Sequence, residues 1–252
     1  STGHLTSLPT SIEYLDVGFC PQIIDMCAIS DRLTKLKHLH MIRAGNKTTA
    51  DNIHRIGSLI HLESLNLRDI NMSGEVLVKA LKPLTNLRSL DLENCSNISP
   101  DALVESFKDG LHTHLNSINL FDCFHVDDTV MIVLSQLPLR SLVVTIPRVT
   151  DEGILKAFCN TSMQKTLRKL EMYSPKKISN VGFLCLTEQL QLESFVFAHS
   201  NRQSIDEAAL VNLPKYQQNI QYLDLTAFAD ISYDSIIDYI APLKKLETLR
   251  VQ

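Results

Sequence analysis

The strongest constraint on the fold is a pattern of apolar residues that returns along the whole chain. Each copy has apolar side chains at a first position and again three and five residues later, as in Leu62, Leu65 and Leu67. The ten copies begin at Ile12, Leu36, Leu62, Leu87, Leu115, Leu139, Leu167, Leu192, Ile220 and Leu246, with a mean spacing of about 26 residues. A period of about 20 to 50 residues is typical of architectures in which each repeat packs against its neighbours. The chain is therefore expected to form one stacked array.

Within each repeat, the spacing changes from that of a strand to that of a helix. Leu65 and Leu67 flank Asn66, and this alternation is typical of a short strand with one buried face. Capping residues then introduce apolar residues at helical spacing. Four such starts are Ser99 before Ala102, Leu103 and Phe107; Thr150 before Ile154, Leu155 and Phe158; Asp206 before Ala209, Leu210 and Leu213; and Ser232 before Ile236, Ile237 and Ile240. The sequence predicts an α/β solenoid, a horseshoe with a parallel concave sheet and convex helices.

Two copies of the repeat carry a cysteine three residues after the last strand leucine. They read LRSLDLENCSNISPDAL from Leu87 and LNSINLFDCFHVDDTVMIVL from Leu115, with Cys95 and Cys123 at that position. With these motifs the chain resembles the leucine-rich repeat family over essentially its whole length, and specifically its cysteine-containing subtype. That subtype is best known from the substrate-receptor domains of F-box ubiquitin ligases. Cys20 also holds the position, whereas the last five repeats have lost it.

The resemblance implies a binding role. Such a domain would hold a target protein or peptide degron on its concave face, and regions outside this chain would contact Skp1 and cullin, or elongin and cullin. We expect residues 1–252 to form a single leucine-rich repeat domain. Because neither end shows a cap and no F-box fits within the sequence, we expect it to be a fragment of a longer chain.

Composition excludes several classes of function. The chain has 24 Lys and Arg against 28 Asp and Glu, a net charge of −4, so it lacks the basic balance that nucleic-acid binding favours. No apolar run reaches the roughly 18 residues of a membrane span. The eight glycines form no phosphate-binding loop, and we expect no bound cofactor.

Six cysteines occur at irregular spacings, which argues against a disulfide framework. Cys20, Cys95 and Cys123 are expected in the interior, and Cys27, Cys159 and Cys185 are expected in the core of helical segments. Reduced thiols indicate the cytoplasm or nucleus. Five N-x-S/T triplets, beginning at Asn46, Asn71, Asn94, Asn97 and Asn160, keep an extracellular receptor open as an alternative.

Histidine pairs are weak candidates for chemistry. His38 and His40 alternate onto one side of a strand, and His112 and His114 precede another, but neither pair has the further ligands that zinc needs. Asp16 would lie beside His40 and orient its imidazole, yet no nucleophile with an oxyanion site accompanies them. We expect no metal site and no catalytic activity.

The concave face is the candidate binding surface. Its exposed apolar members are expected to be Phe121, Tyr173, Val143 and Val196, with Phe121 and Tyr173 as anchors. Phe121 has an alternative, in which its ring folds over the edge onto Phe124. Asp91 and Glu93, beside Arg68, form an acidic patch suited to a basic peptide. The remaining candidates on this face are Asn119, Glu171 and His40.

The sequence therefore predicts a non-catalytic protein-recognition module, which the resemblance narrows to the substrate receptor of a cullin-RING ubiquitin ligase. The alternative is a scaffold or assembly factor with no connection to ubiquitin.

Overall fold

Each apolar triplet of the sequence forms a short strand. The computed structural model describes residues 7–20, 24–44, 50–110, 112–198, 205–228 and 231–251. In these residues, every strand contains the middle apolar residue of its triplet, from Leu15 to Leu249. The chain groups into two units, Ser1–Cys123 and Phe124–Gln252. We call them the first unit and the second unit; the expectation of a single domain stays a prediction.

The first unit has parallel strands that follow one another in sequence order. Its described elements are β1 (Tyr14–Asp16), α1 (Met26–Arg32), β2 (His38–His40), the 3-10 helix η2 (Ile53–Ser58), β3 (Ser64–Asn66), α3 (Gly74–Leu81), β4 (Ser89–Asp91), α4 (Pro100–Phe107) and β5 (Ser117–Leu120). Equivalent leucines pair in register, so that Leu39 lies opposite Leu65 and Leu65 opposite Leu90.

The second unit repeats this arrangement, and its strands β6, β7 and β8 are longer, with five residues each. Its described elements are α5 (Asp128–Leu134), β6 (Ser141–Thr145), α6 (Asp151–Phe158), α7 (Ser162–Thr166), β7 (Lys169–Tyr173), α8 (Asn180–Gln189), β8 (Ser194–Ala198), the 3-10 helix η3 (Glu207–Asn212), α9 (Leu213–Tyr216), β9 (Tyr222–Asp224), α10 (Tyr233–Ser235), the π-helix η4 (Ile236–Ile240) and β10 (Thr248–Arg250).

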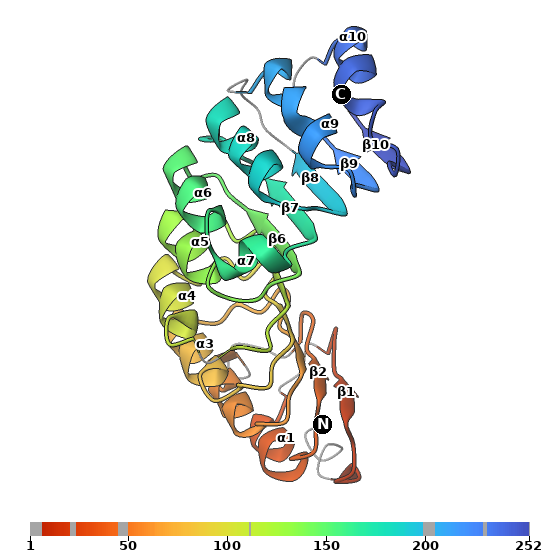
Figure 1. The fold of residues 1–252 in the computed structure, drawn as a ribbon. Helices are drawn as coiled ribbons and strands as arrows, with labels where there is room; N and C mark the ends of the chain where they lie inside the picture. Colours follow the sequence, from red (N-terminus) through yellow and green to blue (C-terminus); the bar gives the residue numbers. More distant parts are fainter. Residues whose placement is uncertain are drawn as a thin grey trace. The chain divides into compact units, whose positions relative to one another are not determined.

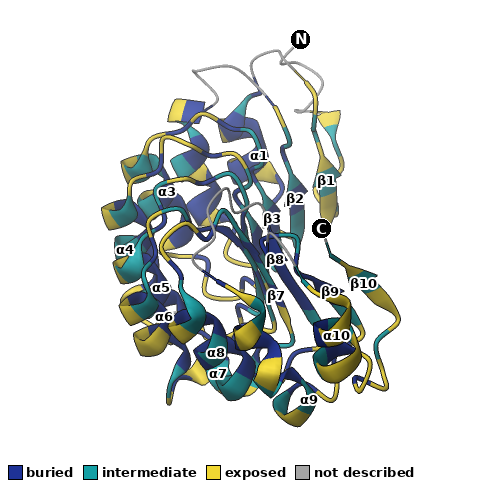
Figure 2. Ribbon diagram, turned by 90° about the horizontal axis from the view of Figure 1, so that it is seen from above, coloured by how far each residue is buried: buried dark blue, intermediate teal, exposed yellow. Residues whose placement is uncertain are grey.

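Strands and helices form two layers within each unit (Figure 1). Buried residues, dark blue in Figure 2, lie between the layers, and exposed residues gather on the outer sides of the helices. The inner triplets are almost fully buried, as Leu65, Leu90 and Leu170 are, whereas Leu15 and Leu249 are half-buried. The predicted α/β solenoid of about ten repeats is confirmed.

The expected capping residues begin their helices. Ser99 and Thr150 accept hydrogen bonds from the backbone N–H groups of Ala102 and Gly153. Asp206 caps η3, and Ser232 caps α10. Two expected core residues are exposed, however: 40% of Leu155 and 48% of Ile237. Leu155 follows the buried Ile154 and is turned about 100° away from it around the helix, so it faces solvent.

Consecutive helix starts in the second unit are joined by side chains. Asp128, the first residue of α5, accepts hydrogen bonds from the N–H and hydroxyl of Thr150, at 2.8 and 2.7 Å. Asp151 of α6 does the same with Ser179, at 2.9 and 2.5 Å, and also accepts from the N–H of Gly182 at 3.0 Å. The first residues of α8 and η3 continue the series through hydrogen bonds, Asn180 with Asp206 and Glu207 with Ser232. We call this series the helix-start ladder.

Glycine makes room for this ladder. A Cβ atom on Gly153 would lie 2.0 Å from Oδ1 of Asp128, and one on Gly182 would lie 2.4 Å from Oδ1 of Asp151. Both distances are far below a van der Waals contact, so only glycine leaves space for the carboxylates of the preceding helix.

In the first unit, cysteines join the repeats. The thiols of Cys95 and Cys123 each lie 3.2 Å from a carbonyl oxygen of the preceding repeat, that of Leu67 and that of Leu92. Burial raises the pKa of Cys95 to about 12 and that of Cys123 to about 11, so both thiols stay protonated donors. The interior position expected for these two cysteines is confirmed.

Two other expected positions are wrong, because Cys20 and Cys27 are exposed. Cys20 belongs to the first repeat, and the described residues contain no earlier repeat whose carbonyl its thiol would meet. Cys27 lies between Met26 and Ala28, which take the buried side of α1. Cys185 is buried as expected, and Cys159 is half-buried.

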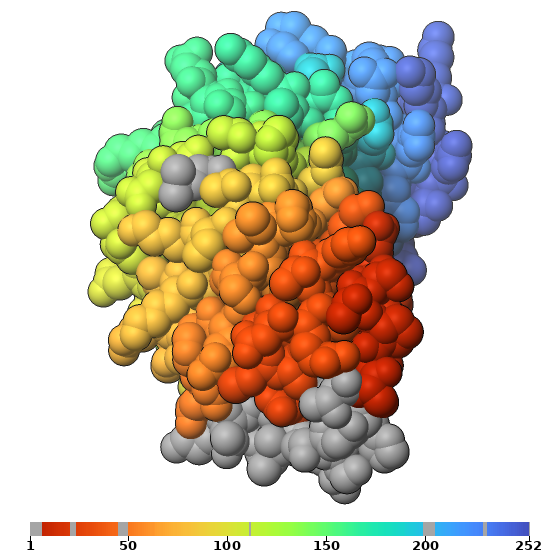
Figure 3. Space-filling view, turned by 90° about the horizontal axis from the view of Figure 1, so that it is seen from below, coloured from red at the N-terminus to blue at the C-terminus, as the bar shows by residue number. Residues whose placement is uncertain are grey.

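The surface of the first unit shows its repeats as successive bands, from red to yellow in Figure 3. In the described part of the chain, no helix is long and apolar enough to cross a bilayer.

Candidate functional site

Polar residues at the strand ends stabilise the turns that follow the strands. The residue between the last two apolar positions is often Asp or Asn, and its Oδ1 accepts a hydrogen bond from the backbone N–H two residues later. This contact recurs, at 2.8 to 3.0 Å, for Asp16, Asn66, Asp91, Asn119 and Asp224. One oxygen of each side chain is therefore occupied by a turn.

The expected acidic patch of the first unit is internally paired. Glu93 lies 2.9 Å from Nη2 of Arg68 and accepts a hydrogen bond from Nδ2 of Asn119 at 3.2 Å. Asp91 accepts one from Nδ2 of Asn66, also at 3.2 Å. Burial raises the pKa of Glu93, and the charge of Arg68 opposes that shift. Glu93 does lie beside Arg68, as the sequence predicted, but a basic peptide would have to compete with Arg68 for the Glu93 carboxylate.

The hydroxyl group of Tyr14 orients the imidazole ring of His40. Its Nδ1 lies 3.2 Å from the hydroxyl of Tyr14, and the two rings meet nearly edge to face, with centroids 5.2 Å apart. Asp16 is the register partner of His40, as expected, but its carboxylate accepts from the N–H of Gly18. The structure gives His40 no hydrogen bond to a carboxylate within the described residues.

The second unit has a hollow of about 280 Å³ on its strand side. The middle strand, β8, contributes Val196 and Ala198, which are 5% and 2% exposed. The strands on either side contribute Tyr173 from β7 and Tyr222 from β9. Small apolar side chains thus lie between two tyrosines. The hollow is further lined by Lys169, Glu171, Ser194, Asp224 and Arg250. We call it the β7–β10 hollow.

Charged groups in the β7–β10 hollow differ in how tightly they are held. Both oxygens of Glu171 are engaged, one 2.8 Å from Nζ of Lys169 and the other accepting from the hydroxyl of Tyr173 at 2.8 Å. Burial and the Glu171 carboxylate raise the pKa of Tyr173, so its phenol stays protonated. Arg250 is held more loosely, because its Nη1 lies 3.9 Å from Oδ2 of Asp224, whose Oδ1 accepts hydrogen bonds from the N–H and the hydroxyl of Thr226 at 3.0 and 2.8 Å.

Two larger hollows lie in the first unit. One of about 380 Å³ is lined by charged residues where the strands begin, including Lys37 and Glu13, paired at 2.9 Å, and Arg88 and Glu63, paired at 3.3 Å. The other, of about 620 Å³, lies near Asp69. Neither has a tyrosine, phenylalanine or tryptophan among its lining residues, so the β7–β10 hollow is the better candidate for recognition.

The four apolar residues expected on the concave face do not all line the same hollow. Tyr173 and Val196 share the β7–β10 hollow, with Glu171 beside them. Val143 is half-buried on β6 and is not among the lining residues, and Phe121 is half-buried at the end of β5 in the first unit. The expectation that solvent reaches Val196 is wrong, because this small side chain lies on the central strand between two tyrosine-bearing strands.

Phe124, the alternative resting place for the Phe121 ring, is 48% exposed. The part of any of these residues in binding stays a prediction.

Sequence reasoning missed Tyr222. It is the first residue of β9 and faces the same side as Asp224, two residues on. The candidates on the concave face came from two outward rows, formed by the residue between the last two apolar positions of each triplet and the residue after the last one. The signal was available, because the first residue of each strand forms a third outward row beside these two.

The two histidines of the second pair lie in different surroundings. His112 is 1% exposed and packs edge to face on Phe107, while His114 is exposed. Across the described stretches of the chain, no three His, Cys, Asp or Glu side chains are placed to hold a metal ion.

Known structures share this arrangement. No protein-family profile matches the sequence, and a search of curated proteins returns no match. An internalin from Listeria monocytogenes is similar with a TM-score of 0.58 at 19% identity, over 96% of this chain and 67% of that chain. A chain of the yeast Rad7 and Elc1 complex has a TM-score of 0.68 at 17% identity, covering 89% of this chain and 58% of that one.

An LRR protein of Leptospira interrogans gives a TM-score of 0.52 at 17% identity, over 100% of this chain and 60% of that chain. This chain therefore spans about two thirds or less of each of these three proteins. At identities this low, the similarity shows only a shared fold. Together with the repeats of its own sequence, it shows that the chain has the leucine-rich repeat fold.

Proposed function

We propose that the chain is a non-catalytic protein-recognition module and that a segment of its partner docks in the β7–β10 hollow. The observation that carries this proposal is the pair Tyr173 and Tyr222 on either side of the small apolar residues Val196 and Ala198. Tyrosine is enriched at protein interfaces, because its ring supplies apolar contact and its hydroxyl a hydrogen bond.

The size of the hollow supports a protein ligand. At about 280 Å³ it falls just below the range of roughly 300 to 1,000 Å³ that is typical of small-molecule sites. A space of this size suits one or two side chains of a partner, and Lys169 and Arg250 supply the charged rim that interfaces commonly have.

In the finer form of the proposal, the domain is the substrate receptor of a cullin-RING ubiquitin ligase in the cytoplasm or nucleus. The resemblance of the repeats to the cysteine-containing subtype supports it, as does the likeness to a chain that crystallised in a complex of Rad7 and Elc1. All six cysteines are free, as suits those compartments. The alternative, a scaffold of a complex unrelated to ubiquitin, uses the same hollow.

Affinity capture from cells tests the proposal, with the full-length protein as bait. The test variant is Tyr173→Ala/Tyr222→Ala, and the matched control is Tyr233→Ala on α10, where the side chain is 76% exposed. A partner lost with the test variant and kept with the control supports docking in the hollow. Circular dichroism melting of both variants checks that each is folded.

The other proteins in the capture separate the two forms of the proposal. Cullin and an adaptor recovered with every bait support the substrate receptor, and a stable complex without them supports the scaffold. Retention of every partner by the folded Tyr173→Ala/Tyr222→Ala variant would overturn the β7–β10 hollow as the docking site.

A further inference from the structure

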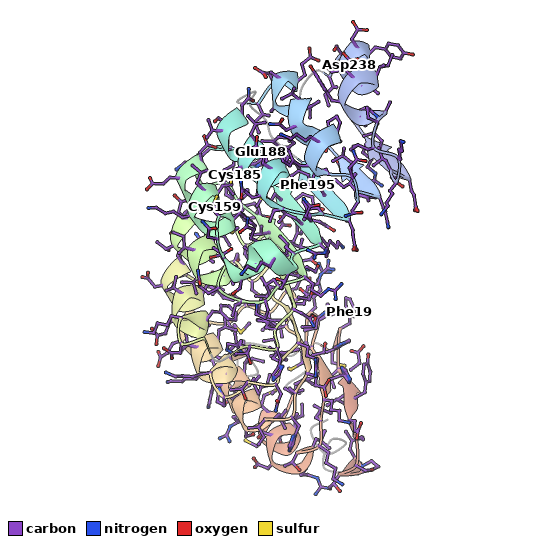
Figure 4. All side chains as sticks on the ribbon, in the orientation of Figure 1. Phe19, Cys159, Cys185, Glu188, Phe195 and Asp238 are labelled. Atoms are coloured by element: carbon purple, nitrogen blue, oxygen red, sulfur yellow. The ribbon has the colours of Figure 1, made fainter. Side chains whose placement is uncertain are left out.

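Two cysteine thiols meet between neighbouring helices of the second unit. Cys159 lies directly after the last residue of α6, Cys185 lies within α8, and α6 packs against α8. Their sulfur atoms are 3.8 Å apart across 26 residues of chain. Figure 4 shows the two labelled side chains close together in the helix layer.

The other four cysteines are arranged differently. Cys95 and Cys123 also come from neighbouring repeats, but each thiol points at a backbone carbonyl, 3.2 Å away, and the sulfur of Cys123 is 4.0 Å from the carbonyl oxygen of Cys95. Cys20 and Cys27 are exposed in the first unit. Among the six, Cys159 and Cys185 are the two whose sulfurs are in direct contact in the structure.

We propose that Cys159 and Cys185 form a disulfide bond when the protein meets a low-molecular-weight disulfide such as oxidised glutathione. A disulfide needs its sulfurs about 2.05 Å apart, so they must approach by a little under 2 Å. Cys159 is placed for that movement: its backbone has left the helix, with φ −100° and ψ 122°, so its side chain is not confined by a following helical turn.

The reaction is a pair of thiol–disulfide exchanges. The half-buried Cys159 is the accessible thiol; it loses its proton and attacks one sulfur of the reagent, whose S–S bond breaks and releases one thiol. Cys185 then loses its proton and attacks the sulfur of Cys159, releasing the second thiol. Two protein thiols are oxidised by two electrons, the reagent is reduced to two thiols, and those thiols carry the two protons.

The environment of Cys185 supports this order. Burial raises the pKa of Cys185 to about 12, and the neighbouring Cys159 adds to the shift, so its thiolate is scarce near neutral pH. Cys185 is therefore a poor first nucleophile, and its attack on the mixed disulfide is faster at alkaline pH. Contact with Cys159 compensates in part, because the second exchange is intramolecular.

The bond would join the helical segments of the repeats that carry β6 and β7. It would close a loop of 26 residues, which restricts the unfolded chain more than the folded one. For a domain of this size, we expect the melting temperature to rise by roughly 5 to 10 °C.

The test uses the chain with Cys20→Ser and Cys27→Ser, so that exposed thiols cannot link two molecules. The folded protein is incubated with excess oxidised glutathione at pH 8.5, quenched with acid, alkylated and digested with trypsin. Cleavage after Lys156, Lys165, Lys177 and Arg202 gives peptides 157–165 and 178–202, each with one of the two cysteines. The expected product is this pair of peptides linked by a disulfide, two hydrogen masses below the sum of the free peptides.

Cys95 and Cys123 serve as internal controls and should be alkylated only after unfolding. In the same background, Cys159→Ser should abolish the linked pair and the rise in melting temperature, while Cys185→Ser should stop at a glutathione adduct on Cys159. Recovery of peptides 157–165 and 178–202 as separate alkylated or glutathionylated species from folded, oxidised protein would overturn the proposal. So would a linked pair that forms only in urea. The outcome is independent of whether the β7–β10 hollow binds a partner.

Discussion

The two units use different side chains to link neighbouring repeats. In the first unit the thiols of Cys95 and Cys123 reach a backbone carbonyl of the preceding repeat near the strand ends. In the second unit the carboxylates of Asp128 and Asp151 reach forward to the next helix start. Because each repeat contacts only its neighbours, a polar link can recur with the period of the array, and neither one residue type nor one place in the repeat is required for it.

The sequence accounts for the change of link. At the cysteine position the second unit has Pro147, Pro175, Ser200 and Phe228, so no thiol occurs there; Pro147, Pro175 and Phe228 have no side-chain donor, and Ser200 lies outside the described residues. Phe228 joins an aromatic cluster instead, edge to face with Phe183 at 5.0 Å. At the helix starts, it is the first unit that lacks the linking side chain. Its helices α3 and α4 begin with Gly74 and Pro100, whose side chains cannot accept a hydrogen bond as the carboxylate of Asp128 does.

The largest effect is expected from Asp151→Ala. Its carboxylate accepts from the N–H and hydroxyl of Ser179 and from the N–H of Gly182, and the change leaves those donors without this acceptor. We expect the free energy of unfolding to fall by about 3 kcal/mol in urea denaturation. Asp101→Ala, at an exposed position in the first turn of α4, is the matched change in the first unit and should cost about 0.5 kcal/mol or less. Equal losses of unfolding free energy in the two variants would show that the hydrogen bonds of the helix-start ladder do not add to stability.

Gly153→Ala should cost about 2 kcal/mol, because the new Cβ would displace the carboxylate of Asp128. The sharper measurement is the same change made in an Asp128→Gly background, because the Cβ of Asp128 would itself lie 2.9 Å from the new Cβ. There both the carboxylate and the Cβ of residue 128 are gone and alanine favours the helix over glycine by about 1 kcal/mol, so the substitution at position 153 should be neutral or stabilising. A loss of the same size in both backgrounds would refute the steric explanation.

Cys95→Ala tests the link of the first unit. It removes the contact of the thiol with the carbonyl of Leu67 and leaves a small cavity, which together should cost about 1 to 2 kcal/mol. Cys27→Ala, at an exposed cysteine, is the control and should change the free energy of unfolding by about 0.5 kcal/mol or less. If the two variants unfold alike, the thiol links are incidental to stability.

His112 and Gln217 give a smaller, pH-dependent contrast between the units. Each lies three residues before the first apolar position of its triplet, where Leu59 and Leu84 stand in earlier repeats. Gln217 is buried and donates to the carbonyls of Thr187 and Leu190, at 2.6 and 2.7 Å, and its charge state does not depend on pH.

Burial lowers the pKa of His112, so the unfolded chain binds its proton more readily than the folded protein. The stability associated with neutral His112 is fully present above about pH 6.5, the pKa of an unperturbed histidine, and is lost as pH falls toward the folded pKa. Between pH 7.5 and 5.5 the wild-type chain should lose about 1 kcal/mol more than His112→Leu. Gln217→Leu should lose as much as the wild type over that range, and parallel curves for wild type and His112→Leu would contradict the assignment.

The candidate site could be predicted only in part. Alternation along the strands correctly placed Glu171 and Tyr173 on the outward face and placed Glu93 next to Arg68. It did not show that Glu93 is already paired with Arg68 or that Val196 is covered, because those facts depend on side chains of neighbouring strands. Tyr222 was missed because only two of the three outward rows were considered.

The sequence by itself determined the repeats, the strands and the helix starts at Ser99, Thr150, Asp206 and Ser232. These depend on local spacing and capping, which act over a few residues and recur with the period. Only the tertiary structure decided what spans one repeat to the next: the helix-start ladder, the meeting of Cys159 with Cys185, and the grouping of Tyr173, Val196 and Tyr222 in one hollow. Such contacts join residues about 22 to 31 apart in the chain, and the stacking of repeats brings them within a few ångströms of each other.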